Sequence, residues 1–449
     1  MRVLVIGGGG REHALADTLR RSLRVHQVFC APGNAGTARI ASNLAIRTED
    51  HRGLLQAAQE LGIHLTVVGP EAPLCSGIVD RFRTAGLRIF GPTAAAARIE
   101  GDKGYAKRLM KNARVPTAEG RMFENHAEAR DYVASRETGV VVKAAGLAGG
   151  KGVFVCEDSA DGLTALDKIM VENQFGDAGD TVVVEELLRG EELSVFALVS
   201  GHTIYVLDSA QDYKRIGDHG TGANTGGMGA VSPGPLATSE IMSIVERDIL
   251  VPIVDALESD GAAYTGLLYA GLMITPGGPK VLEFNCRFGD PETQVLLIRL
   301  ESDLAELLLA ATDGTLEQAD VRWSPKPAVS VVMASQGYPD AYETGHVIEG
   351  LDHAADSEDV RVFHCGTAHV EHLLVTSGGR VLAVSARGDD LENARAKAYE
   401  AVRRIHFQNQ YYRTDVGLFS KQQRFRRDGG AAAVEQSRTH RTGQLSLDL

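Results

Sequence analysis

The stretch Val3-Leu4-Val5-Ile6-Gly7-Gly8-Gly9-Gly10-Arg11-Glu12-His13 begins with a short apolar run, continues through four glycines and ends where a helical pattern starts. The same alternation of apolar runs and amphipathic patterns continues to about residue 100. This βαβ order predicts a parallel sheet with right-handed crossovers, in which ligands bind at the carboxyl ends of the strands. The expected strands are Val3–Ile6, Val28–Ala31, Leu65–Val68 and Arg88–Phe90, and the expected helices are Glu12–Arg24, Gly53–Leu61 and Ser76–Ala85.

The first glycine-rich loop indicates phosphate binding, because backbone N–H groups at a helix N-terminus attract anions. The dinucleotide pattern Gly-x-Gly-x-x-Gly is not met from Gly7, since Glu12 occupies the third glycine position. No acidic residue near Phe29–Gly33 is placed to hold a ribose hydroxyl. We therefore favour a phosphate site, such as one for a phosphorylated sugar, over NAD binding or a tight structural turn.

The amino-acid composition excludes further classes of function. The 449 residues include 46 Lys and Arg against 59 Asp and Glu, so the net charge of -13 argues against nucleic-acid binding. The length predicts about three domains, and the 50 glycines predict loops that approach a ligand closely. Five scattered cysteines without a Cys-x-x-Cys pair encode neither a disulfide framework nor a zinc site. No apolar run is long enough for a signal peptide or a membrane helix, so we expect a cytoplasmic protein without a membrane partner.

Beyond residue 115 the apolar runs are closely spaced, which predicts antiparallel strands. The central part should contain strands at Val140–Ala145, Val153–Cys156, Thr181–Glu185, Leu193–Ser200, Thr203–Asp208, Tyr269–Thr275 and Lys280–Asn285, with helices from Gly162 and over 239–259. A third unit starts near Pro325, with strands at 328–334, 361–365, 370–376 and 380–386 and a helix at 391–405. From Lys421 to Leu449 six Lys and Arg face three Asp and Glu, and we expect a disordered tail.

Two further glycine-rich segments carry candidate functions. Lys143–Gly152 lies between two expected strands and is no Walker A motif, because Gly152 replaces the required Ser or Thr. We interpret it as a hairpin whose amides close over nucleotide phosphates while Lys143 neutralises them, with a flexible surface hairpin as the alternative. Thr221–Ala230 follows Lys214 and is interpreted as an ordered loop near an anion, with a linker as the alternative.

The segment Glu283-Phe284-Asn285-Cys286-Arg287-Phe288-Gly289-Asp290-Pro291-Glu292 is the most specific. On a strand, Glu283 and Asn285 share one face, and their oxygens suit Mg²⁺. Arg287 could then bind a carboxylate or phosphate bidentately, and the alternative is a polar strand end with a solvated ion pair. Glu185–Glu192 ends another apolar strand and could bind adenine and ribose, although such charge runs are usually solvated turns.

Together these segments resemble the ATP-grasp superfamily and, within it, the phosphoribosylamine–glycine ligase (glycinamide ribonucleotide synthetase) family. The resemblance extends from about residue 1 to residue 418. It rests on long runs: Val5–Leu15, Ala31–Thr37, Val68–Leu74, Pro116–Ala118, Asn224–Ala230, Tyr269–Ile274, Glu283–Thr293 and Phe363–Thr367.

The resemblance implies a mixed α/β fold: a Rossmann-like N-terminal parallel sheet, ATP-grasp domains with antiparallel sheets and a small C-terminal α+β domain. We expect a phosphoribosylamine domain at 1–102, an ATP-grasp domain at 103–324 with a lid at about 120–190, a C-terminal domain at 325–420 and the tail at 421–449. The implied reaction belongs to purine biosynthesis. It joins glycine to 5-phosphoribosylamine through glycyl phosphate, with ATP as a substrate and Mg²⁺ or Mn²⁺ as the metal, in a monomeric enzyme.

The resemblance also implies roles for individual residues. ATP binding falls to Lys103, Lys143, Gly149, Gly150, Lys151, Gly152, Glu185, Glu186, Leu188 and Glu192, and metal binding to Glu283 and Asn285. Substrate binding falls to Gly8, Gly9, Gly10, Asn34, Gly36, Thr37, Glu71, Gly226 and Gly227. The expected catalytic residues are Arg287, Asp212, Lys214 and Asp290.

Some positions depart from the family pattern. The family usually has Asp after Lys-Ala in the second glycine-rich loop, where this chain has Ala145, and it has Pro and Tyr where Ala223 and Val231 stand. Two alternatives therefore stay open: another ATP-grasp carboxylate–amine ligase or carboxylase, and a catalytically impaired nucleotide-binding paralogue. The last six residues, Gln444–Leu449, resemble peptides that bind the bacterial sliding clamp, a match that is usually accidental in such tails.

Overall fold

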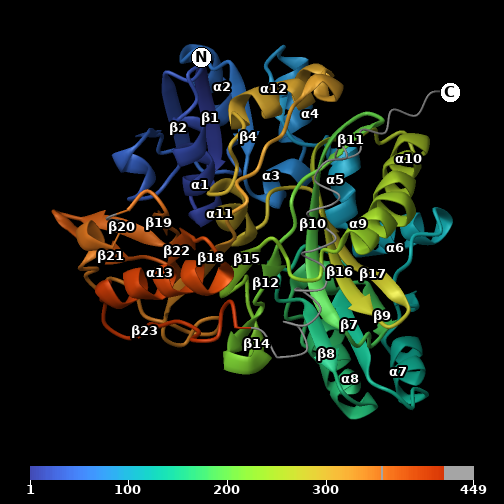
Figure 1. Ribbon diagram of the computed structural model, residues 1–449. Coiled ribbons are helices and arrows are strands. Elements are labelled where there is room, and N and C mark those ends of the chain that lie inside the picture. The colour runs from blue at the N-terminus through green and yellow to red at the C-terminus, as the bar shows by residue number, and fades with distance from the viewer. Residues whose placement is uncertain (355–356, 419–449) are drawn as a thin grey trace.

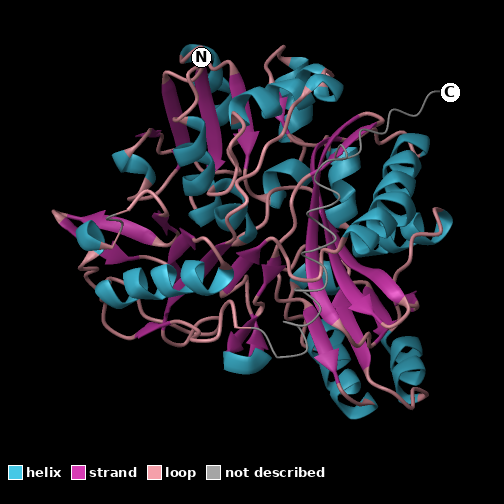
Figure 2. Ribbon diagram, in the orientation of Figure 1, coloured by secondary structure: helices cyan, strands magenta, loops and turns pink. Residues whose placement is uncertain are grey.

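A computed structural model describes residues 1–354 and 357–418 of the chain. The expected tail and its clamp-like peptide lie outside these residues. The mixed α/β class expected from the sequence is confirmed, with a parallel N-terminal sheet and antiparallel sheets elsewhere (Figures 1 and 2). Within the described residues no helix has the length and apolar character needed to cross a bilayer.

The N-terminal unit is a five-stranded parallel sheet in the order β3-β2-β1-β4-β5. Its central strand β1 (Arg2–Gly7) forms because Val3 to Ile6 are apolar and fully buried. The expected strands and helices are present with bounds shifted by a few residues. The other elements are β2 (Gln27–Pro32), β3 (Ser42–Asn43), β4 (Leu65–Val68), β5 (Ile89–Phe90), α1 (Gly10–Leu19), η1 (Thr37–Arg39), α2 (His51–Glu60), α3 (Glu71–Cys75), α4 (Ile78–Thr84) and α5 (Ala94–Gly101).

Two four-stranded antiparallel sheets make up the central part, in the orders β6-β9-β7-β8 and β11-β10-β16-β17. Their strands are β6 (Gly120–Phe123), β7 (Val140–Ala144), β8 (Val153–Cys156), β9 (Val182–Glu186), β10 (Glu191–Ser200), β11 (Thr203–Val206), β16 (Thr265–Thr275) and β17 (Gly278–Asn285). The helical segments here are α6 (Lys103–Asn112), α7 (His126–Ala134), α8 (Ser159–Leu166), η2 (Asp167–Val171), η3 (Gly176–Gly179), α9 (Ser239–Val245), η5 (Glu246–Leu250) and α10 (Val251–Ser259).

The C-terminal sheet includes strands from the central part of the chain. Its order is β12-β15-β18-β22-β19, with β23 also paired to β18. Its strands are β12 (Gln211–Asp212), β15 (Gly229–Ser232), β18 (Ala328–Ser335), β19 (Val360–His364), β22 (Arg380–Arg387) and β23 (Gln410–Tyr411). The remaining elements are β13 (Arg215–Gly217), η4 (Asp218–Gly220), β14 (Thr221–Asn224), α11 (Glu292–Leu297), α12 (Leu304–Asp313), η6 (Leu316–Gln318), η7 (Leu351–His353), β20 (Thr367–Val370), β21 (Leu373–Thr376) and α13 (Leu391–Arg404).

Two expectations about local structure are wrong. The single strand expected at 370–376 is a hairpin of β20 and β21, because the chain reverses at Glu371, whose φ is 55°. Thr221–Ala230 was expected to lack strands, but its two ends form β14, paired with β13, and the start of β15, paired with β12 and β18. The glycines between these strands form the bend.

The apolar core determines which parts of the molecule form one body. Residues of the N-terminal sheet, such as Leu4 and Ile6, share a continuous core with β10 and β16. The β6–β9 sheet and its helices α7 and α8 instead have a separate core, formed by residues such as Val133, Val142 and Val184. The sheet that carries the second glycine-rich loop therefore forms, with α7 and α8, a subdomain with its own apolar core.

Candidate active site

A cavity of about 490 Å³ lies where the central sheets meet α5, α6 and Glu71, the first residue of α3. Its walls bring together residues that are far apart in the sequence. The predicted site residues that line it are Glu71, Lys103, Lys143, Gly149, Gly150, Gly152, Glu185, Glu186, Leu188, Glu192, Asp212, Lys214, Gly226, Glu283, Asn285, Arg287 and Asp290. The predicted site residues that do not line it are Gly8, Gly9, Gly10, Asn34, Gly36, Thr37, Lys151 and Gly227.

A buried carboxylate joins two lysines on the cavity wall. Lys143 and Lys107 each place Nζ 2.7 Å from a different oxygen of Glu185. Burial alone would raise the pKa of Glu185, but the two ammonium groups outweigh it and hold that pKa below its usual range. Three charges therefore share one small volume with one net positive charge, a suitable environment for an anion.

Lys103 lies at the start of α6, beside the second glycine-rich loop. Its Nζ donates to the carbonyl of Gly146 at 2.9 Å, and its backbone N–H donates to the carbonyl of Ala145 at 2.9 Å. Burial lowers the pKa of Lys103, while Glu283 opposes that effect. Ala145 is buried and does not itself line the cavity.

The end of β17 presents two oxygen donors to the cavity. Glu283 and Asn285 alternate with Phe284, which is buried on the opposite face. Lys214 places Nζ 2.9 Å from Glu192 and 3.6 Å from Glu283. Burial raises the pKa of Glu283, but Lys214 and two other lysines outweigh it and lower that pKa, so Glu283 is ionised at neutral pH.

Arg287 connects this strand end to the N-terminal unit. Its guanidinium lies 3.0 Å from Glu100, 3.5 Å from Glu71 and 3.1 Å from the side-chain oxygen of Asn285. Burial raises the pKa of Glu100, which also accepts from the backbone N–H of Cys286 at 2.7 Å. The two glutamates hold Arg287 at the junction of the two units.

A second acidic group lies across the cavity. Asp212 has a buried oxygen, Oδ1, without a hydrogen-bond partner, and burial together with Glu292 raises its pKa well above the usual range. Glu292 is buried and accepts from the hydroxyl of Tyr269 at 2.7 Å. An unpaired carboxylate oxygen on the cavity wall is available to a ligand donor.

The first glycine-rich loop lies next to the cavity without lining it. A Cβ on Gly9 or on Gly10 would lie 3.7 Å from the carboxylate of Asp290, so this loop is adjacent to a lining residue. Asn34 uses its side chain to support the loop: its amide donates to the carbonyl of Gly8 at 2.9 Å, and its oxygen accepts from the backbone of Gly36 and Thr37. Thr37 is fully buried.

The chain matches three family models: the N domain of phosphoribosylglycinamide synthetase over residues 1–100, its ATP-grasp (A) domain over 101–293 and its C domain over 328–419. The phosphoribosylamine–glycine ligase of Rhodopirellula baltica is 48% identical over 421 residues, which are 92% of this chain and 96% of that protein. This chain belongs to the phosphoribosylglycinamide synthetase family. The ligase of the same name from Xanthomonas axonopodis pv. citri is 49% identical over 93% of this chain and 97% of that protein. The crystal structure of the Thermotoga maritima phosphoribosylamine–glycine ligase has a TM-score of 0.81 at 34% identity and covers 92% of this chain and all of that one (100%).

Residues from all three matched phosphoribosylglycinamide synthetase domains meet at or beside the cavity. Sequence reasoning missed three side chains that line the cavity, Lys107, Glu100 and Glu292. It also missed Arg380 of the C domain, which does not line the cavity but contacts Asp290. Lys107 could have been found, because it lies one helical turn after Lys103 on α6. No local pattern marks Glu100 or Arg380.

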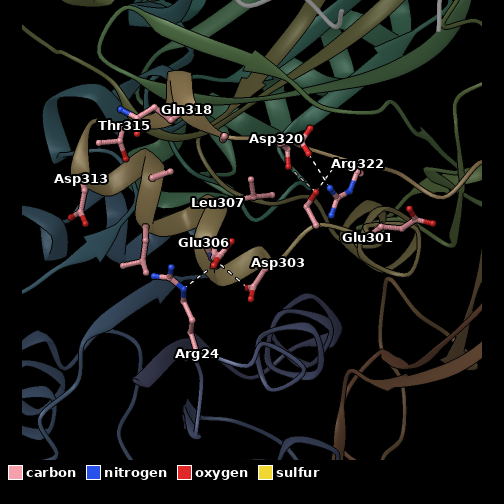
Figure 3. A pocket seen from close by; sticks show the side chains of 14 residues that line it. Arg24, Glu301, Asp303, Glu306, Leu307, Asp313, Thr315, Gln318, Asp320 and Arg322 are labelled. Atoms are coloured by element: carbon pink, nitrogen blue, oxygen red, sulfur yellow. Dashed lines mark hydrogen bonds and ion pairs between the residues drawn. The ribbon is translucent and has the colours of Figure 1, made fainter. Parts of the chain in front are cut away.

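A larger hollow of about 650 Å³ lies elsewhere in this family member, along α12 and the segment that follows it (Figure 3). Two ion pairs lie on its wall: Arg24 is 2.7 Å from Glu306, and Arg322 is 3.0 Å from Asp320. It contains none of the predicted site residues. We therefore assign the function to the smaller cavity.

Proposed function

We propose that this chain joins glycine to 5-phosphoribosylamine at the expense of ATP, forming glycinamide ribonucleotide, ADP and phosphate in purine biosynthesis. The family assignment, with models that match residues 1–293 and 328–419, supports the reaction. The observation that carries the site is the single cavity in which Lys103, Lys143 and Arg287 lie with the oxygen donors of β17. The same cavity wall therefore carries cationic side chains that can bind the ATP phosphates and further polar groups that can bind a second substrate.

The chemistry follows from the poor reactivity of a carboxylate towards an amine. A glycine carboxylate oxygen attacks the γ-phosphorus of ATP, the bond to the β-phosphate oxygen breaks, and glycyl phosphate and ADP form. The amine of 5-phosphoribosylamine then attacks the glycyl carbonyl carbon, loses a proton and expels phosphate. No side-chain nucleophile is required, so the protein acts by positioning and by stabilising charge.

The ATP half of the site is proposed from the lysines and the second glycine-rich loop. Lys103 and Lys143 bind phosphates, and the amides of Gly149, Gly150 and Gly152 close over them together with Lys151. Leu188 and Glu186 contact adenine from the end of β9, and Glu192 holds the ribose. Glu185 contributes by orienting Lys143, and it is itself held by a second ion pair with Lys107.

The acceptor half is proposed from the N-terminal unit and its junction with the cavity. The loop Gly8–Gly10, supported by Asn34, Gly36 and Thr37, receives the sugar phosphate, and Glu71 binds the ribose. Arg287 and Lys214 stabilise the acyl phosphate, while Asp212 and Asp290 bind amine groups beside the loop Gly226–Gly227.

The donor set on β17 fits a divalent metal ion. Glu283 is ionised, Asn285 supplies a neutral oxygen, and both line the cavity near the proposed phosphate site. Two hard oxygen donors suit Mg²⁺ or Mn²⁺, which keep other positions for water and phosphate. We propose that these residues hold the metal, which supplies neutralisation of phosphate charge when bound.

The remaining proposals concern organisation. We retain the domain limits at 102, 324 and 420, the lid at about 120–190, a monomeric state and a cytoplasmic location as predictions. An impaired paralogue is not favoured, because Ala145 does not line the cavity and its backbone carbonyl accepts from the backbone N–H of Lys103. A different ATP-grasp carboxylate–amine ligase or carboxylase remains the second candidate, to be separated by substrate omission.

The test measures ADP, phosphate and glycinamide ribonucleotide with ATP, Mg²⁺, glycine and freshly prepared 5-phosphoribosylamine. We expect all three products in equal amounts, and none of them when glycine is omitted. Ala145→Asp should change kcat by less than threefold, since the new carboxylate would lie outside the cavity wall. ATP cleavage without glycine would refute the proposal, and a tenfold or larger gain with Ala145→Asp would favour the impaired paralogue.

A further inference from the structure

Arg380 is a C-domain residue that reaches the edge of the cavity. It is the first residue of β22, and its side chain is 21% exposed. No sequence motif discussed above includes it. Its guanidinium donates to groups on two segments that lie far from it in the chain, around Gly226 and around Asp290.

The Asp290 contact is bidentate in effect. Nη2 of Arg380 lies 2.9 Å from Oδ2 of Asp290, and Nη1 donates to the backbone carbonyl of the same residue at 2.7 Å. Gln294 donates to the other carboxylate oxygen, Oδ1, at 2.7 Å. Both oxygens of Asp290 are therefore fixed in direction, and each still has a lone pair for a ligand.

The same guanidinium holds the third glycine-rich loop. Nη1 of Arg380 donates to the carbonyl of Gly226, while the backbone N–H of Gly226 donates to the hydroxyl of Tyr338 at 3.0 Å. The next residue, Gly227, has φ +104°, and a Cβ there would lie 2.4 Å from Pro291. The loop thus fits closely between the C domain and the segment of Asp290.

Through these contacts Arg380 acts on the side of the cavity that we propose binds the acceptor substrate, 5-phosphoribosylamine. Asp290 and Gly226 both line the cavity, and Gly9 and Gly10 of the first loop lie beside the carboxylate of Asp290. The lysines proposed for ATP binding make no contact with Arg380. Burial opposes the charge on Arg380, but Asp290 outweighs it and raises the pKa of the guanidinium, which therefore stays charged.

We infer that Arg380 is a positioning residue that holds Asp290 and the Gly226–Gly227 loop in the geometry that binds 5-phosphoribosylamine beside the acyl phosphate. The inference rests on the proposed function. It makes the C domain a functional part of the acceptor site, because this domain orients groups that the ATP-grasp domain contributes.

The experiment compares Arg380→Met, Arg380→Lys and Tyr338→Phe with the control Arg387→Met in the full chain. Arg387 lies at the other end of β22, where its Nε is 2.9 Å from the carboxylate of Asp359. Neither residue lines the cavity. Steady-state kinetics give kcat and the KM for each of the three substrates, and thermal unfolding gives Tm for every variant.

We expect Arg380→Met to raise the KM for 5-phosphoribosylamine at least tenfold and to leave the KM for ATP within twofold. Arg380→Lys should recover part of this loss, because it retains the charge but not the two-pronged contact. Tyr338→Phe should shift the same KM by a smaller factor. Arg387→Met should lower Tm without changing either KM.

Two outcomes would overturn the inference. One is a parallel rise in the KM for ATP and for 5-phosphoribosylamine in Arg380→Met, which indicates general damage. The other is a set of kinetic constants in Arg380→Met equal to those of Arg387→Met. If the unaltered chain forms no glycinamide ribonucleotide, the proposed function itself fails, and that result is separate from both.

Discussion

Glu185 and Glu186 are neighbours in the sequence but lie in opposite environments. Glu185 is buried between Lys107 and Lys143, whereas the side chain of Glu186 is 41% exposed and lies 2.9 Å from Lys280. The alternation of β9 explains the difference, because successive side chains point to opposite faces of a strand. The charge run therefore contains one buried and one partly exposed carboxylate, and both line the cavity.

This contrast predicts different costs for two matched substitutions. Glu185→Gln leaves two buried ammonium groups without their counter-charge, and we expect it to lower the free energy of unfolding by about 3–5 kcal/mol. Glu186→Gln breaks a partly exposed pair and should cost about 1 kcal/mol or less. Urea unfolding followed by circular dichroism measures both values, and equal losses would contradict the assignment.

At the scale of an element, the hairpin between β7 and β8 combines open and crowded glycines. Gly149 and Gly150 have φ of +57° and +75°, and a Cβ at either would meet no atom within 4 Å. A Cβ at Gly152 would instead lie 2.6 Å from the side chain of Ala148 and 3.1 Å from that of Ala144. Of these three glycines, Gly152 alone leaves no room for a Cβ.

The hairpin therefore predicts an order of effects on ATP binding. Gly150→Ala meets backbone strain of about 1 kcal/mol and should raise the KM for ATP by less than fivefold. Gly152→Ala must displace the loop itself, and we expect a rise of tenfold or more. Steady-state kinetics with saturating glycine and 5-phosphoribosylamine test this order, which the reverse ranking would refute.

At the scale of the whole molecule, two histidines join the N-terminal and C-terminal units. His13 on α1 accepts at Nδ1 from the backbone N–H of His364 on β19 at 2.8 Å. Burial, with contributions from Arg20 and Arg39, lowers the pKa of His13 to about 4. Burial and His13 lower the pKa of His364 to about 3. The folded molecule therefore keeps both rings neutral.

These histidines predict a loss of stability in acid. The unfolded chain protonates them near pH 6.5, so it binds more protons than the folded chain as the pH falls from 6.5 towards 4. Their contribution is complete above pH 6.5 and decreases below it by about 1.4 kcal/mol per pH unit for each histidine. Urea unfolding between pH 4.5 and 7.5, at points spaced by about half a unit, measures this slope.

A variant separates this effect from other acidic groups. His13→Asn keeps a hydrogen-bond acceptor near the position of Nδ1 but cannot titrate, so its stability should fall less steeply with acid. His372→Asn, in the exposed turn between β20 and β21, serves as the control and should keep the original slope. An unchanged slope in His13→Asn would rule out the proposed linkage.

The sequence by itself determined the local elements and the chemical motifs of this protein. Apolar periodicity and turn glycines act over a few residues, so the parallel N-terminal sheet, the hairpin of β10 and β11, and the position of Glu283 and Asn285 on one strand could be predicted. The hairpin of β20 and β21 was missed, because both strands are short and polar residues such as His369 and His372 interrupt the apolar pattern, so no pattern marks the reversal at Glu371.

Only the tertiary structure decided which groups surround those motifs. Lys107 on α6 pairs with Glu185 of β9, and Glu100 on α5 pairs with Arg287, which follows β17. Arg380 pairs with Asp290, 90 positions away in the chain. Such contacts depend on how separate sheets pack, and no spacing or composition near these residues records that packing. The motifs could therefore be identified from the sequence, whereas the groups that hold them in place could be identified only from the folded structure.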